Sequence, residues 1–139
     1  MRTWLLSFAL LVPTAVSAQS ERLPLSGVAE ETRSLWERQD APALLSGSPQ
    51  VILQLPGADP SAPVERQQAI HLLRDFFARS EEVETQLHDA RELDNGWGLV
   101  ELRRRYRVRG TQDVREQLLL LSYRESGKSW MLVELRVGR

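Results

Sequence analysis

The stretch from Glu65 to Arg79 constrains the fold more than any other part of this chain. At about 100° per residue its apolar side chains fall within one arc, while polar side chains fill the opposite side. The apolar arc consists of Ala69, Ile70, Leu72, Leu73, Phe76 and Phe77. This pattern predicts an amphipathic helix of about four turns, with Ser61 as a candidate N-cap and Pro63 just ahead of the first turn. Such a helix needs an apolar surface to lie on.

The chain after this helix predicts antiparallel strands joined by tight turns. Asn95-Gly96 is the clearest turn, because a type I′ turn needs positive φ at both central residues. A two-residue turn there predicts three cross-strand pairs: Asp94 with Trp97, His88 with Arg103, and Glu84 with Arg107. A second turn around Gly110-Thr111 predicts the pairs Arg105 with Glu116 and Leu102 with Leu119.

These registers assign one face of the sheet to the core, because side chains alternate between the two faces of a strand. The positions on that face are Val83, Thr85, Leu87, Val100, Leu102, Tyr106, Val108, Leu119, Leu121 and Tyr123. The last strand, Ser129 to Val137, carries Met131, Val133, Leu135 and Val137 at period two. For these four to face the core, the preceding loop must be Ser126-Gly127-Lys128, because a shift of one residue turns every side chain to the other face.

Two more helices and a strand are indicated ahead of the long helix. Ser26 is a candidate N-cap for a helix that ends near Gln39. Asp40 caps a second, shorter helix that has a proline in its first turn, and the segment Gln50 to Leu55 is β-branched and apolar, as a strand requires. We expect residues 19–27 to form a flexible lead and residues 28–138 to form one domain.

Two short helices, a strand, a long helix and a meander of strands make an α+β order, with helices on one side of a curved sheet. The sequence resembles the nuclear transport factor 2-like (cystatin-like) cone fold, and within it a domain-of-unknown-function family of small secreted bacterial proteins. Four segments carry the resemblance: Val51–Gly57, Gln68–Phe77, Tyr106–Gly110 and Trp130–Val137. It implies a curved antiparallel sheet wrapped around a long helix and two N-terminal helices, a cavity used for small ligands or catalysis, and frequent dimerisation through the outer sheet face.

The resemblance assigns no reaction, and the residues do not supply one. Asp40 is placed as a helix cap, and His71 and His88 fall on polar, outward-facing positions. The chain has no cysteine, and it lacks metal-ligand spacing, a phosphate-binding glycine loop and a nucleophile elbow. We therefore expect no catalytic residues, no metal and no cofactor.

Arg104 breaks the pattern of the core face, because it lies between Leu102 and Tyr106. A buried guanidinium needs an anion, an acidic side chain or water. Two interpretations stay open: the side chain extends from the end of the sheet into water, or it faces a ligand. In the second case the ligand is a small apolar molecule with an anionic or acceptor group, and the ligand-binding residues are Arg104, Tyr106, Arg115 and Gln117.

The opposite face of the sheet has a charged part and an apolar part. The charged part is an alternating stripe of Arg103, Arg105, Arg107 and Arg109, which with Glu84 and Glu116 opposite it predicts a solvated, paired surface. The apolar part comes from three strands and consists of Leu99, Leu118, Leu120, Trp130 and Leu132. A contiguous apolar patch usually marks an interaction surface, so we expect a homodimer through this outer face.

These features favour a non-enzymatic binding or protein-interaction domain that acts through its cavity or its sheet face. The alternative is a small-molecule enzyme of the isomerase or dehydratase type that works in the cone cavity, and a purely structural partner subunit is a third hypothesis. A cavity carboxyl or His with a strongly perturbed pKa would favour the enzyme. A cone filled by side chains would favour the structural subunit.

Residues 1–18 have the three parts of a cleaved signal peptide. Arg2 is a minimal basic region, Trp4 to Val12 is a short apolar run, and Val16-Ser17-Ala18 ends it with small residues. The run is shorter than the about twenty residues that a membrane span needs, so no integral membrane segment is expected after cleavage. Of the 18 basic residues, 17 remain against 19 acidic ones once Arg2 is removed, and this balance predicts no attraction to nucleic acid.

We predict that the mature protein begins at Gln19 and lies outside the cytoplasm, in the periplasm if the source is a Gram-negative bacterium. The reason is that the small residues ending at Ala18 are those that signal peptidase requires. N-terminal sequencing of the exported material checks this. An intact Met1 on protein recovered from the cytoplasm contradicts it.

Overall fold

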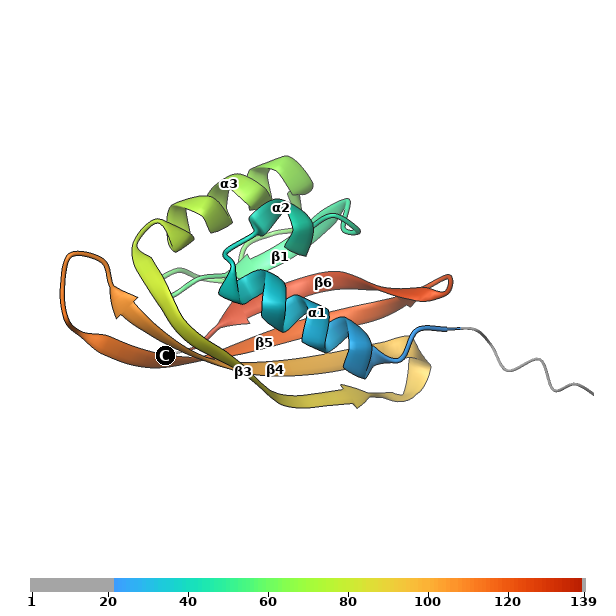
Figure 1. The fold of residues 1–139 in the computed structure, drawn as a ribbon. Coiled ribbons are helices and arrows are strands. Elements are labelled where there is room, and N and C mark those ends of the chain that lie inside the picture. Colours follow the sequence, from blue (N-terminus) through green and yellow to red (C-terminus); the bar gives the residue numbers. More distant parts are fainter. Residues whose placement is uncertain (1–21, 139) are drawn as a thin grey trace, which may run out of the picture.

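The structure, a computed structural model, describes residues 22–138, and its elements follow the α+β order expected from the sequence (Figure 1). The helices are α1 (Leu25–Glu37), α2 (Ala41–Leu44) and α3 (Arg66–Phe77). The strands are β1 (Gln50–Gln54), β2 (Val64–Glu65), β3 (Ser80–Glu92), β4 (Trp97–Val108), β5 (Val114–Ser126) and β6 (Ser129–Val137). The predicted signal peptide, residues 1–18, lies outside the described residues.

The six strands form one curved, open sheet in the order β2-β1-β6-β5-β4-β3. Strands β3 to β6 make the antiparallel meander that the turn signals predicted, whereas β1 pairs in parallel with β6. Between β4 and β5 the predicted register is confirmed, with Arg105 opposite Glu116 and Leu102 opposite Leu119. The predicted antiparallel sheet therefore contains one parallel pair, which brings the N-terminal half of the chain beside its last strand.

All three helices lie on one face of this sheet, and the core fills the space between them and the strands (Figure 1). α1 runs along the strands and buries Leu25, Ala29, Thr32 and Trp36. α3 buries Ala69, Ile70, Leu73 and Phe77, and its Leu72 and Phe76 are partly buried against the same core, so the predicted apolar arc is confirmed. No helix within residues 22–138 is long and apolar enough to cross a membrane.

Helix caps agree with the sequence at one predicted position and differ at another. Asp40 caps α2, because its carboxylate accepts a hydrogen bond from the backbone N–H of Ala43 at 3.2 Å. α3 begins at Arg66 and is not capped by Ser61. The hydroxyl of Ser61 instead accepts a hydrogen bond from the backbone N–H of Leu53 at 2.9 Å, so this residue fixes the loop before α3 to strand β1.

The segment expected to be a flexible lead is part of the domain from Arg22 onwards. α1 begins at the buried Leu25, one residue earlier than the predicted cap. The guanidinium of Arg22 forms ion pairs with Glu92 at 2.5 Å and with Glu125 at 2.8 Å. These two carboxylates lie at the ends of β3 and β5, so Arg22 connects the chain before α1 to both neighbouring hairpins.

The β3–β4 hairpin differs from its prediction in loop length and in regularity. A three-residue turn, η1 (Asp94–Gly96), replaces the two-residue turn, although Asn95 and Gly96 do have the expected positive φ, 66° and 76°. Two bulges in β3, at Val83 and His88, shift the register further. The pairs that replace the predicted ones are Glu92 with Gly98, Gln86 with Arg103, and Glu84 with Arg105.

The bulge at Val83 decides which side chains of β3 enter the core. Val83, predicted to face the core, is 40% exposed. Because the bulge adds one residue to β3, Glu82 takes the inward position instead, and its side chain is 2% exposed. A carboxylate therefore lies where an apolar side chain was expected.

The last strand reaches the core by a bulge and not by the predicted three-residue loop. Ser126 pairs with Ser129, which leaves a two-residue turn, and the register then shifts at Val133. Before the shift Trp130 and Leu132 face the core, with exposed fractions of 7% and 4%. Beyond the shift the inward positions are Leu135 and Val137, as predicted. Met131 and Val133 face outwards instead and are only half-buried.

Candidate functional site

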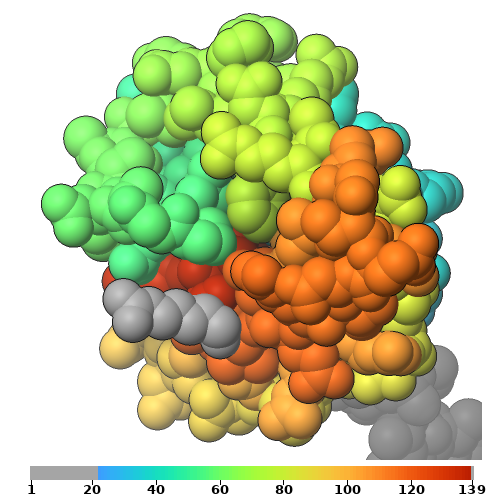
Figure 2. All heavy atoms as spheres, turned by 90° about the vertical axis from the view of Figure 1, so that its left-hand side faces the viewer, coloured from blue at the N-terminus to red at the C-terminus, as the bar shows by residue number. Residues whose placement is uncertain are grey.

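The open sheet leaves a pocket of about 340 Å³ where β1 and α3 end and the β4–β5 hairpin begins. We call it the wide-end pocket. Figure 2 looks onto this end and shows a recess between the segment after β1, the end of α3 and the β4–β5 hairpin. Its apolar walls are Leu55, Pro56, Leu72, Phe76, Tyr106 and Val108. Its polar members are Asp75 and Arg79 at the exposed rim and Ser80, Arg104 and Gln117 in the deeper part.

Arg104 forms the bottom of the wide-end pocket and is 1% exposed. Its Nη2 forms an ion pair with the carboxylate of Glu82 and donates a hydrogen bond to Ser80 Oγ at 2.9 Å. Its Nη1 donates to Gln117 Oε1 at 3.2 Å. The interpretation in which Arg104 extends into water is therefore wrong, because the guanidinium is enclosed and has an acidic partner.

Three aromatic rings surround the same guanidinium. Its central carbon lies 4.2 Å from the ring centre of Tyr106, 5.2 Å from that of Phe76 and 5.5 Å from that of Trp36. A cation over an aromatic face is worth up to about 2 kcal/mol when water is excluded. Since these rings come from β4, α3 and α1, Arg104 connects the sheet to two of the helices.

Glu82 lies behind Arg104, away from the pocket lumen. One carboxylate oxygen faces Arg104 and the other accepts a hydrogen bond from the hydroxyl of Thr85 at 3.1 Å. Burial raises the pKa of the Glu82 carboxyl, and the attraction of Arg104 opposes this rise. Burial likewise lowers the pKa of Arg104, while Glu82 raises it, but a guanidinium keeps its proton in proteins. The pair therefore carries a permanent cation opposed by a desolvated carboxylate.

Three of the four predicted ligand-binding residues line one pocket. Arg104, Tyr106 and Gln117 all border the wide-end pocket, with Tyr106 and Gln117 half-buried. Arg115 does not border it. Although Arg115 is opposite Tyr106 in the sheet, its exposed side chain turns to Asp113, with a contact of 2.8 Å. The prediction that Arg115 contacts the ligand is therefore not supported by its position.

Neither histidine lines the wide-end pocket, although His71 lies beside its rim residue Asp75. His71 is exposed on α3, 3.6 Å from Asp75, and His88 is exposed on β3, 3.4 Å from Glu101. Within residues 22–138 no three His, Asp or Glu side chains are grouped so that they could hold a metal ion.

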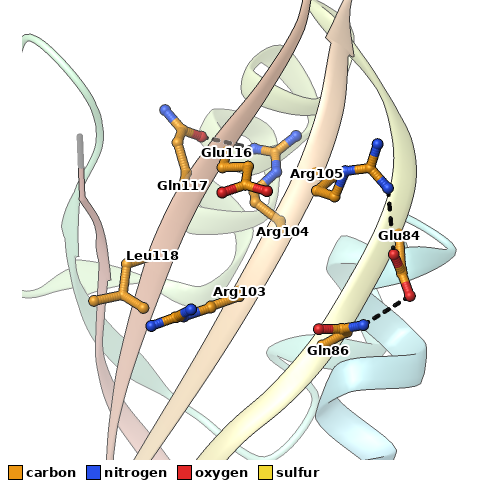
Figure 3. A pocket seen from close by; sticks show the side chains of 8 residues that line it. All are labelled: Glu84, Gln86, Arg103, Arg104, Arg105, Glu116, Gln117 and Leu118. Atoms are coloured by element: carbon orange, nitrogen blue, oxygen red, sulfur yellow. Dashed lines mark hydrogen bonds and ion pairs between the residues drawn. The ribbon is translucent and has the colours of Figure 1, made fainter.

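A second depression, of about 310 Å³, lies on the outer face of the sheet over β3, β4 and β5 (Figure 3). Figure 3 shows Arg105 reaching Glu84, at 3.5 Å, and Glu84 bonded to Gln86, at 2.9 Å. Farther along the stripe, Arg107 and Arg109 both pair with Glu81, at 3.6 and 3.7 Å. The arginine stripe is thus largely paired at the surface, as predicted, so this depression has weaker features of a binding site than the wide-end pocket.

The predicted apolar patch on the outer face is smaller than expected. Leu99, Leu118 and Leu120 lie on this face, and Leu120 is 44% exposed. Trp130 and Leu132 do not, because the two-residue turn before β6 directs both side chains into the core. Their assignment to an interface is therefore wrong, and the three leucines from β4 and β5 remain.

Glu82 and Ser80 are the functional candidates that sequence reasoning missed. Strict alternation from the predicted core positions Val83, Thr85 and Leu87 would put both on the outer face, and the bulge at Val83 reverses that placement. A signal was present, because a core-face arginine requires an acidic partner. A search for one would have led to the carboxylates at the start of β3 and from there to a bulge.

No protein-family model matches the sequence, and no curated protein matches it. The ketosteroid isomerase-like protein from Erwinia carotovora atroseptica has a similar structure, with a TM-score of 0.65 and 15% identity over 81% of this chain and 91% of that one. A DUF4783 family protein from Bacteroides uniformis has a TM-score of 0.64 and 12% identity over 79% of this chain and 94% of that one. An NTF-2 like protein of unknown function from Shewanella oneidensis has a TM-score of 0.59 and 12% identity over 82% of this chain and 95% of that one. The predicted nuclear transport factor 2-like cone fold is confirmed.

We predict that Arg104→Met lowers the free energy of unfolding by about 3 kcal/mol or more at neutral pH, because it leaves the Glu82 carboxylate buried without a cation. In the variant the attraction of Arg104 no longer opposes the rise in the pKa of Glu82, so the folded state favours the protonated carboxyl more than in the wild type. A raised folded-state pKa adds stability at low pH that is lost as pH rises through that pKa. The difference in the free energy of unfolding between the wild type and Arg104→Met should therefore shrink as the pH falls from about 7.5 to about 5.

Urea unfolding at both pH values measures this, with Arg103→Met as the control. Arg103 is the exposed neighbour on β4, and its loss should change stability by no more than about 0.5 kcal/mol. Equal losses in the two variants, or a deficit of Arg104→Met that grows on acidification, would contradict the prediction.

Proposed function

We propose that this protein, which has the nuclear transport factor 2-like cone fold, is an exported, non-enzymatic binding domain that holds a small molecule in its wide-end pocket. The observation that carries the proposal is the buried Arg104 at the bottom of an open pocket whose walls are mainly apolar. Apolar walls with a few convergent polar groups are the usual composition of a ligand site. The volume, about 340 Å³, is near the lower end of the about 300–1,000 Å³ range of such sites.

The state of the nearby acid and base groups supports binding over acid-base catalysis. Glu82 is the buried carboxyl closest to the pocket, and both of its oxygens are engaged, by Arg104 and Thr85. The carboxylate that borders the pocket, Asp75, is exposed at its rim. A general acid or base must reach the substrate proton within about 3 Å. Neither of these two carboxylates is therefore placed as a free, buried general acid or base in the pocket.

Export is the second part of the proposal, and it rests on residues 1–18. Their basic start, short apolar run and small residues at positions 16–18 match a cleaved signal peptide. A domain without cysteine has no disulfides to support it outside the cell, so its hydrophobic core has to provide the stability.

The neutral fluorescent dye N-phenyl-1-naphthylamine tests the binding site. We predict that it binds the purified wild-type protein and that Leu72→Trp lowers its affinity about tenfold or more, because the larger ring occupies the pocket. Val83→Trp, which adds a ring at an exposed position of β3, is the control and should bind as the wild type does. Circular dichroism confirms that both variants fold. The proposal fails if the dye does not bind the wild type, or if Leu72→Trp leaves its affinity unchanged.

We also propose that two copies of the chain associate through the outer face of the sheet. The supporting observation is the exposed Leu120, which lies between Glu101 on β4 and Arg136 on β6, with Leu99 diagonally beside it. An apolar centre with charges of both signs around it suits a two-fold contact, in which the same patch meets itself.

Sedimentation at micromolar concentration tests this association. We predict a dimer that Leu120→Glu converts to monomer, because the new carboxylates would be placed against each other in an apolar contact. Leu93→Glu is a matched control, since Leu93 is 43% exposed in the β3–β4 turn region, away from the patch. A monomeric wild type, or a dimer that survives Leu120→Glu, rules out this interface.

A further inference from the structure

We infer that the wide-end pocket selects uncharged molecules with a hydrogen-bond acceptor and rejects carboxylates, because Glu82 neutralises Arg104 from behind. This inference rests on the proposed binding function and adds the chemical class of the ligand. From the sequence, Arg104 alone pointed equally to an anion or to a neutral acceptor. The position of Glu82 beside Arg104 favours the neutral acceptor over the anion.

Arg104 has more N–H donors than its neighbours accept. A guanidinium has five N–H bonds. Within the described part of the chain, three of them go to Glu82, Ser80 and Gln117, and the Nε atom, which is buried, has no partner. A buried donor without an acceptor is costly. Nε–H and one N–H of Nη1 are thus left without an acceptor among the described residues, so a ligand that reached the floor of the pocket would meet unused donors.

Gln117 adds a second donor at the same place. Its amide oxygen accepts from Arg104, so its NH₂ group is the part available to a ligand. Since both Arg104 and Gln117 border the pocket, the polar end of a ligand meets donors there, and a carbonyl or ether oxygen suits them.

The charges around Arg104 decide between an anion and a neutral acceptor. Arg104 and Glu82 are both removed from water, with side chains 0% and 2% exposed, and together they are neutral. At the rim, the exposed Asp75 and Arg79 carry opposite charges. A carboxylate that enters the pocket loses its hydration but gains no uncompensated cation, whereas a neutral acceptor loses far less. The walls, six apolar or aromatic side chains, favour an apolar body for either molecule.

Two ten-carbon probes, 2-decanone and decanoate, separate these cases by competition with N-phenyl-1-naphthylamine at about pH 8, above the usual range of carboxyl pKa values. In the wild type we expect 2-decanone to bind about tenfold or more tighter than decanoate. In Glu82→Gln the side-chain shape is kept and the countercharge is lost. Decanoate should then gain about tenfold or more in affinity, while 2-decanone changes little.

Glu84→Gln is the matched control, because it removes the same charge two residues along β3 on the outer face. It should bind both probes as the wild type does. If decanoate binds the wild type as well as 2-decanone does, or if Glu82→Gln does not improve decanoate binding, the inference is overturned while the binding function stands. Dye binding with no competition by either probe also overturns it. Absence of dye binding to the wild type overturns the proposed function as well. Should Glu82→Gln fail to fold, the wild-type preference between the two probes still decides.

Discussion

The wide end of this molecule depends on the buried ion pair between Arg104 and Glu82. Either charge alone would cost several kcal/mol to remove from water, so each is tolerated only because the other is present. The pair is enclosed by Trp36 of α1, Phe76 of α3 and Tyr106 of β4, which means that both helices must be docked on the sheet before the charges are shielded. Because the guanidinium also engages Ser80 and Gln117, a polar floor is formed beneath apolar walls.

The elements and most of the core could be predicted from the sequence, since hydrophobic periodicity and turn residues are local signals. The apolar arc of α3 and the pairing of Leu102 with Leu119 are examples. The bulges at Val83 and Val133 could not, because the residues on each side of a bulge still alternate normally. A single added residue reverses every inward and outward assignment on one side of it. That reversal brought Glu82 into the core and removed Trp130 from the outer face.

The residues that line the pocket could be predicted where one residue contradicted its surroundings, and could not where side-chain geometry decided. Arg104 was identified because a charge on an apolar face must have a partner, and Tyr106 and Gln117 followed from their neighbouring positions in the sheet. Arg115 was included by the same reasoning, but an exposed side chain near the start of β5 is free to turn outwards, and it pairs with Asp113. The register of a strand fixes where each Cβ atom lies. It does not fix the direction that a long side chain takes at the end of the strand.

The two ends of the cone differ in how far the chain itself covers them. At the narrow end the first turn of α1 lies so close to β4 that a Cβ on Gly98 would be 2.8 Å from a methyl group of Leu25. The indole N–H of Trp130 donates to the carbonyl oxygen of Leu23 at 2.9 Å, and Arg22 lies over the indole ring. These contacts close that end with residues 22–25. The wide end has no such cover among the described residues, so the proposed ligand would enter there and meet the apolar walls before it reached Arg104.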